Sequence, residues 1–143
     1  MKIHDILERN GHDVVTIPEG RSVLDAARKL VEYNIGALVV THDGHPTGII
    51  TERDILRQTA KTPGELGATP VGVVMTRDLV VADPDDALQE IMEIMTQRKV
   101  RHLPVVREKQ LLGIVSIGDL INACLSRAED ENAHLRQYIH GGG

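Results

Sequence analysis

Hydrophobic and polar residues follow two patterns along the first half of the chain, one typical of helices and one typical of strands. Over residues 22–33 apolar side chains recur at the three- and four-residue spacing of one helix face. Short runs rich in β-branched residues predict strands, and Asp43-Gly44 predicts a hairpin turn between two of them. The expected elements are a strand at 14–17, a helix at 22–33, strands at 37–41 and 47–50, and a helix at 51–60.

The second half repeats this order. Shifting the chain by 65 residues (119 − 54) aligns 13–56 with 78–121 without a gap, and hydrophobic class agrees at almost every position. The second copy should contain a strand near 79–82, a helix at 86–97, strands at 103–106 and 111–115, and a helix at 116–126. A short amphipathic segment precedes each copy, with apolar residues at Ile3, Ile6 and Leu7 or at Val71, Val74 and Met75.

The repetition predicts an α+β fold made of tandem β-α-β-β-α units. Each unit alone has half a core, so the two should pack sheet to sheet about a pseudo-two-fold axis. We expect the first repeat at 1–62, a linker at 63–69, the second repeat at 70–126, and a short C-terminal helix with a flexible tail at 127–143. Leu135, Tyr138 and Ile139 should lie near one face of that last helix, and the tail should be Gly141-Gly142-Gly143.

Composition narrows the classes of function. Hydrophobic residues make up 41% and charged residues 26%, which is typical of a folded soluble protein. With no Trp or Phe the core must be aliphatic, and a base-stacking platform for single-stranded nucleic acid is excluded. A net charge of −5 offers no basic surface to nucleic acid or anionic lipid. The single cysteine, Cys124, allows no internal disulfide, and no signal peptide or membrane span is evident, so we expect a cytoplasmic protein.

Each copy carries one polar motif where a strand should end and a helix begin. Residues 48–54 and 113–119 both read Gly, two aliphatic residues, a hydroxyl residue, two variable residues and Asp. A Thr or Ser followed three residues later by an acid is typical of a capping box, which satisfies free N–H groups at a helix start. Two features favour a ligand instead. A capping box prefers the longer Glu or Gln, and the motif recurs in register, so two helix N-termini should face each other.

The chemistry of the motif suits a nucleotide. A helix N-terminus binds phosphate through its free N–H groups and its dipole. The carboxylates of Asp54 and Asp119 can each accept two hydrogen bonds from a ribose diol, at about 1.5–3 kcal/mol per bond. Gly48 and Gly113 leave two interpretations open: a turn into the strand, or close approach of a ligand to the backbone.

The paired motif, with 35–40 and 100–105 ahead of it, resembles the CBS-domain pair, or Bateman module, over residues 3 to 126. The resemblance implies a regulatory module that binds adenine nucleotides or adenosyl ligands (AMP, ADP, ATP, NAD or S-adenosylmethionine) in clefts between the repeats, without a catalytic cofactor. By position it places ribose hydroxyls at Asp54 and Asp119, with Thr51 and Ser116 facing ribose or the α-phosphate. Backbone around the following residues would hold adenine: Thr16, Val81, Ile35, Gly36 and Ala37.

The remaining implied contacts differ between the copies. Arg101 and His102 stand where the family places phosphate-binding cations, whereas the first copy has Gly36 and Ala37 there. Arg53 of the first copy corresponds to Gly118, and Pro104 completes the implied site. The two clefts should therefore differ in phosphate affinity. His102 is equally consistent with a half-buried residue of an edge strand, and Arg53 with a surface residue.

Other chemistry finds little support in the sequence. No base is placed to activate Thr51, Ser116 or Cys124, so we expect no enzyme, and His42 and His45 lack a third metal ligand. The main hypothesis is a homodimeric sensor of adenine nucleotides, with a further protein partner downstream. The alternatives are a ligand-free dimerising scaffold that acts through its C-terminal helix, and a redox regulator acting through Cys124 and a thioredoxin-like partner.

Overall fold

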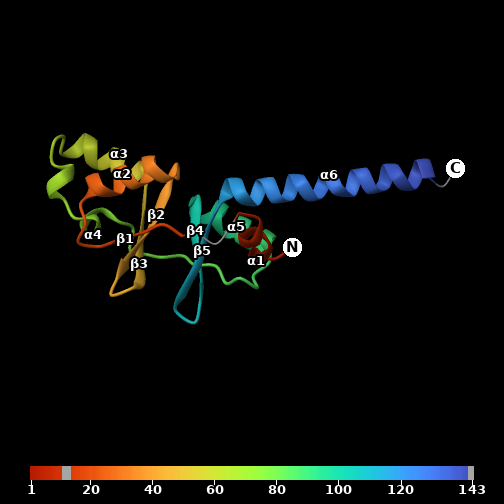
Figure 1. Cartoon of the computed structure of the whole chain (residues 1–143), viewed down its shortest axis with the longest axis horizontal. Coiled ribbons are helices and arrows are strands. Elements are labelled where there is room, and N and C mark those ends of the chain that lie inside the picture. The colour runs from red at the N-terminus through yellow and green to blue at the C-terminus, as the bar shows by residue number, and fades with distance from the viewer. Residues whose placement is uncertain (11–13, 142–143) are drawn as a thin grey trace.

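The chain folds into two similar halves (Figure 1), and the computed structural model describes residues 1–10 and 14–141, with side chains as far as residue 132. The first half contains α1 (Ile3–Asn10), β1 (Thr16–Pro18), α2 (Val23–Tyr33), β2 (Ala37–His42), β3 (His45–Thr51) and α3 (Glu52–Lys61). The linker holds the 3-10 turn η1 (Leu66–Ala68). The second half contains α4 (Val71–Val74), α5 (Leu88–Arg98), β4 (His102–Arg107), β5 (Gln110–Ser116) and α6 (Ile117–Gly141).

Each half is built on a β-hairpin in the same register. In the first half β2 and β3 are antiparallel, with Ala37 opposite Thr51, and β1 lies parallel to β2. In the second half β4 and β5 place His102 opposite Ser116, which are the equivalent positions. Positive φ angles at Asp43 and Gly44, 50° and 80°, form the predicted hairpin turn. The α+β fold and the tandem repeat are confirmed.

The strand predicted near 79–82 is reduced to a single bridge. Ala82 donates its N–H to the carbonyl of Pro104 at 2.9 Å and accepts from the N–H of Val106 at 2.9 Å. The chain leaves the sheet directly afterwards, because Asp83 donates its N–H to the carboxylate of Asp86 and Pro84 has no N–H to donate. The strand prediction is therefore wrong for all but one residue.

The helix predicted at 116–126 and the C-terminal helix predicted within 127–143 form one helix, α6, of 25 residues. No Gly or Pro stands between Asp119 and His140, so nothing in the sequence ends the helix between them. The predicted C-terminal helix is present, and it continues α6 without a break. The tail residues Gly142 and Gly143 lie outside the described residues, as do the side chains of Leu135, Tyr138 and Ile139. No helix of the described residues is both long enough and apolar enough to span a membrane.

The amphipathic segment ahead of each copy packs on the core of the other copy. Ile3, Ile6 and Leu7 of α1 belong to the same buried cluster as Leu103, Val115 and Leu120 of the second half. Val71 and Met75 are buried with Ile17, Leu38 and Ile50 of the first half. Figure 1 shows α1 beside α5 and β5, far from β1. The sequence boundaries at 62 and 70 therefore do not separate the two cores.

The glycine that opens each motif makes this exchange possible. A Cβ on Gly48 would lie 2.5 Å from Sδ of Met75 and 2.8 Å from the carbonyl oxygen of Thr76. A Cβ on Gly113 would lie 2.5 Å from Cδ2 of Leu7. Both glycines are closely approached, but not by the ligand that one of the two interpretations expected. The group that approaches is a segment of the chain itself.

Gly48→Ala should accordingly destabilise the protein by about 1–3 kcal/mol, the usual cost of overpacking. Gly113→Ala should cost less, because its clash is with the end of one flexible side chain, whereas Gly48 faces a backbone oxygen. Gly20→Ala, with no atom near its added Cβ, is the matched control and should be close to neutral. Urea unfolding of the three variants tests this, and equal loss at Gly48 and Gly20 would contradict it.

Candidate functional site

Both motif aspartates fold back onto their own main chain. Asp54 accepts the N–H of Thr51 through Oδ2 at 2.9 Å, and the Thr51 hydroxyl accepts the N–H of Asp54 at 3.3 Å. In the second half Asp119 accepts the N–H of Ser116 at 2.9 Å, and the Ser116 hydroxyl accepts the N–H of Asp119 at 3.0 Å. Both motifs are capping boxes, so the preference of such boxes for Glu or Gln does not favour a ligand here.

The capping boxes leave part of each helix entrance open. Each aspartate uses Oδ2, and within the described part of the chain no hydrogen bond is made by Oδ1 of Asp54 or Asp119. The N–H of Glu52 donates to the carbonyl of Gly36 at 3.1 Å, and that of Ile117 donates to the carbonyl of Arg101 at 2.8 Å. The first four N–H groups of a helix have no acceptor within the helix itself. Each helix entrance, meaning the N-terminus of α3 or α6, therefore presents Oδ1 of its aspartate beside the backbone N–H groups of the first helical turn.

The two entrances meet where Gly36, Glu52 and His102 converge. A Cβ on Gly36 would lie 2.6 Å from Oε1 of Glu52 and 3.4 Å from Nε2 of His102, so these three residues are in close contact. Gly36 and Glu52 belong to the first repeat and His102 to the second. This group, with Asp119, is called the inter-repeat cluster below. Glu52 was not predicted as a site residue; its place in the first turn of a helix was the available signal.

Electrostatics of the cluster are set by His102. Burial lowers the pKa of His102 from its ordinary value of 6.5, and Arg101 lowers it further. The carboxylates of Asp119 and Glu52 act in the opposite direction and do not overcome burial. His102 is therefore half-buried and neutral at pH 7, as the edge-strand interpretation expects, and its neutral ring faces two carboxylates.

The lowered pKa of His102 predicts a loss of stability in mild acid. The unfolded chain binds the proton more readily than the folded chain, so this contribution is complete above pH 6.5 and declines as the pH falls through that value toward the folded pKa. His102→Asn should flatten the fall in the urea midpoint between about pH 7.5 and 5.5, a range above most carboxylate titration. An unchanged slope in the variant would show that other histidines cause it.

The other predicted residues are not all available to a ligand. The carbonyl of Thr16 accepts Nζ of Lys29 at 2.8 Å, the N–H of Ile35 donates to Leu30, and the carbonyl of Pro104 accepts the N–H of Ala82. Ala37 is buried in β2, opposite Thr51. Arg53, Val81 and Arg101 are exposed. Among the predicted residues, the structure places Gly36 and Asp119 near His102, and the hydroxyl of Ser116 accepts the N–H of Asp119.

One cavity borders the predicted set. It has a volume of about 220 Å³ and lies between the end of α1 and the first turns of α6, where Arg9 and Asn10 stand across from Asp119, Asn122 and Ser126. Typical small-molecule sites measure about 300–1,000 Å³. A larger hollow of about 550 Å³, between Met1, Gln89 and Arg127, contains none of the predicted residues. Arg9 is a cation near Asp119 that the sequence analysis did not consider.

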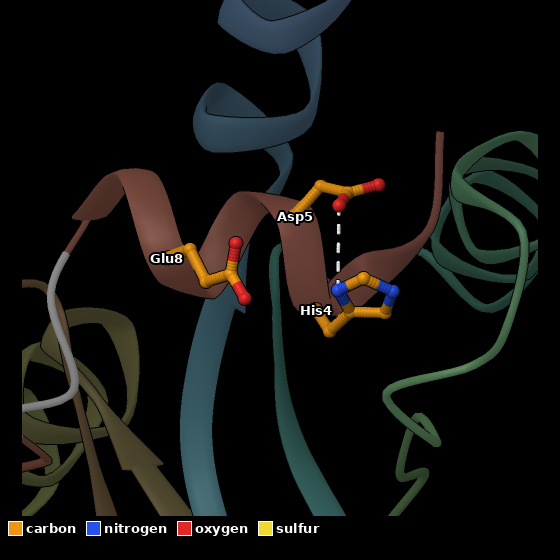
Figure 2. A group of neighbouring side chains, drawn as sticks. All are labelled: His4, Asp5 and Glu8. Atoms are coloured by element: carbon orange, nitrogen blue, oxygen red, sulfur yellow. Dashed lines mark ion pairs between the residues drawn. The ribbon is translucent and has the colours of Figure 1, made fainter.

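Figure 2 shows a separate group of possible metal ligands on α1: His4, Asp5 and Glu8. Nδ1 of His4 lies 3.3 Å from Oδ1 of Asp5, and Oδ2 of Asp5 accepts the N–H of Lys2 at 2.9 Å. That backbone bond is the main cause of the lowered pKa of Asp5. All three residues are at least partly exposed on one helix and Asp5 caps that helix, so the group by itself does not indicate a metal site.

Comparison with known proteins agrees with this architecture. The model of the "CBS domain" family matches residues 3–61 and 71–126. The chain is 37% identical over 126 residues to the CBS domain-containing protein CBSX3, mitochondrial, of Arabidopsis thaliana, covering 85% of this chain and 61% of that protein. It therefore spans about three fifths of the length of that relative.

Solved structures show the same arrangement. The CBS-domain containing protein ATU1752 from Agrobacterium tumefaciens is 40% identical with a TM-score of 0.82, covering 86% of this chain and 98% of that one. The CBS domain pair of protein MJ0100, solved in complex with 5-methylthioadenosine and S-adenosyl-L-methionine, is 25% identical with a TM-score of 0.79, covering 89% of this chain and 98% of that one. From its twin hairpins, matched capping boxes and exchanged helices, the chain belongs to the CBS domain family, with two CBS domains in tandem.

Proposed function

We propose that the protein is a regulatory module that binds an adenosyl ligand between its two repeats. The observation that carries the proposal is the pair of equivalent helix entrances, each with an aspartate whose Oδ2 is held by its own cap and whose Oδ1 is open. A cap fixes the direction of the carboxylate before the ligand arrives, which lowers the ordering cost of binding a diol. The adenosyl ligands of the MJ0100 domain pair support the same class.

The charges of the inter-repeat cluster favour a ligand with few phosphates. Glu52 and Asp119 both lie near His102, which is neutral at pH 7, and Arg101, the arginine that acts on His102, is exposed. A triphosphate there would meet two carboxylates, whereas the sulfonium and ammonium groups of S-adenosylmethionine would be attracted by them. Within the predicted list of AMP, ADP, ATP, NAD and S-adenosylmethionine, the cluster therefore favours S-adenosylmethionine or an uncharged adenosyl compound over ATP.

A thermal-shift series tests the proposal. At 100 times its dissociation constant a ligand that binds only the folded protein adds about 2.7 kcal/mol of stability. S-adenosylmethionine and methylthioadenosine should raise the thermal unfolding temperature more than ATP does at equal concentration. Glu52→Gln should reduce the difference between the shift caused by these two ligands and the shift caused by ATP. No shift with any of them at millimolar concentration would leave the scaffold as the better account. The redox alternative gains nothing from Cys124, which packs half-buried with its Sγ 3.7 Å from Sδ of Met92.

The protein is further proposed to act as a homodimer. Leu56 of α3 is 70% exposed, and Ile121, its equivalent in α6, is 45% exposed. Two large apolar side chains that stand exposed at equivalent positions of the two repeats suit contact with a second copy. A ligand could then change the angle between the repeats and be sensed across the dimer.

A further inference from the structure

The C-terminal half of α6 has no counterpart in the first repeat. Figure 1 shows this part of the helix extending well past the rest of the fold. The stretch from Arg127 to Gly141 is helical. An isolated helix of roughly 12–15 residues is only marginally stable in water when nothing packs against it. Its continuation as one rod with the folded part of α6 calls for a surface that packs along it.

The residues of α6 divide into two faces. Leu120 and Ala123 are buried against the second repeat. Ile121, Leu125, Ala128 and Asn132 are exposed and follow one another at spacings of four, three and four residues. The sequence continues the same spacing at Leu135 and Ile139. This is the a/d repeat of a coiled coil, with Leu125, Asn132 and Ile139 at a positions and Ile121, Ala128 and Leu135 at d positions.

Two polar features of this seam specify the partner. A single asparagine at an a position, here Asn132, is the typical determinant of register and of a two-stranded state. Glu131 then falls at a g position and Arg136, five residues later, at the following e position. In a parallel pair of identical helices, Glu131 of each copy would lie opposite Arg136 of the other copy, which gives two equivalent ion pairs. Glu131 pairs within the helix with Arg127 at 3.5 Å, an exposed contact of little strength that leaves it free to pair across the seam.

We infer that α6 forms a parallel two-stranded coiled coil with α6 of a second copy of this chain, along the seam from Ile121 to Ile139. The inference rests on the proposed dimer and adds the element that holds it together and sets its orientation. With both second repeats joined by one coiled coil, the two ligand sites of the dimer are placed on the same side of the assembly.

Sedimentation equilibrium of the full-length chain tests the affinity. Leu125→Asp, an exposed position in the single chain, should weaken the dimer by on the order of 100-fold or more, because the change acts on both copies. Glu131→Arg should weaken it by about 3- to 10-fold, and adding Arg136→Glu should restore most of the loss. Asp130→Arg, on the outer face of the same turn, is the matched control and should change little. A dimer unaffected by Leu125→Asp and by Glu131→Arg would overturn the inference.

Oxidative cross-linking tests the orientation. On a Cys124→Ser background, Ile139→Cys should form a disulfide-linked dimer, because parallel in-register helices place the two copies of residue 139 side by side. Antiparallel helices would place them about 27 Å apart at 1.5 Å per residue, so an absence of cross-linking in a chain that still sediments as a dimer would overturn the coiled coil alone. A wild-type chain that sediments as a monomer at every concentration would overturn the proposed dimer with it, and ligand binding, measured separately, would be untouched by either result.

Discussion

Replacing both Ile3 and Ile6 with alanine should unfold the second repeat, although both residues precede the first repeat in the chain. Each side chain is at most 1% exposed and packs in the cluster that contains Leu103 and Val115. A buried Ile→Ala change costs about 2–5 kcal/mol, so the pair should remove about 4–10 kcal/mol. Because the whole protein is expected to be stable by about 5–15 kcal/mol, this loss is large enough to abolish the folded second repeat.

Hydrogen exchange locates the damage. Amides of β4 and β5 should lose protection in the double variant, while those of β2 and β3 should keep more of theirs. Glu8→Ala, at an exposed position of the same helix, serves as the control and should leave both hairpins protected. If β2 and β3 opened first instead, α1 would have to pack on the first repeat, contrary to the exchange described above.

Replacing Asp119 with asparagine and, separately, with alanine should distinguish its capping of α6 from its proposed part in ligand binding. Asparagine keeps an oxygen that can accept the N–H of Ser116, so the cap and most of the stability should remain. Asparagine lacks the negative charge that would strengthen hydrogen bonds to the ribose of the proposed ligand. Two such bonds at about 1.5–3 kcal/mol each set the upper limit on the loss of binding free energy. We expect ligand affinity to fall by about 10- to 100-fold in Asp119→Asn, with a stability change well below that of Asp119→Ala.

The alanine variant provides the comparison. Losing the cap entirely should cost about 0.5–2 kcal/mol of stability, which urea unfolding would register. Calorimetric titration of both variants with S-adenosylmethionine completes the test. If Asp119→Asn bound as tightly as the wild type, Asp119 would be a capping residue and nothing more. Asp54→Asn repeats the comparison at the other entrance.

The sequence predicted the elements well where one physical signal dominates. The apolar stripe of 22–33 became α2, which begins after the N-cap Ser22, and the Asp43-Gly44 pair became a hairpin turn. Prediction failed where tertiary contacts decide. The apolar stripe of α1 shows that one face is buried but not which core covers it, and 79–82 has strand composition but is followed by Asp83-Pro84, which turns the chain away.

The candidate site could be predicted only in part, for a similar reason. Motif spacing identified Asp54 and Asp119, but both form caps despite the short side chain, since Oδ2 of each lies 2.9 Å from its backbone N–H. Glu52 and Gly36 meet His102 only because the two repeats face each other, which no local pattern records. The charge of the cluster, on which the proposed choice among adenosyl ligands rests, therefore needed the structure.

Calorimetric titration of the wild-type protein with S-adenosylmethionine, beside the double variant Asp54→Asn/Asp119→Asn, addresses the central proposal most directly. The wild type should give a saturable isotherm with at least one site per chain, and the double variant should remain folded and lose most of that binding. A flat wild-type titration at millimolar ligand, or equal binding by a folded double variant, would contradict the proposal that these two carboxylates hold the sugar of an adenosyl ligand.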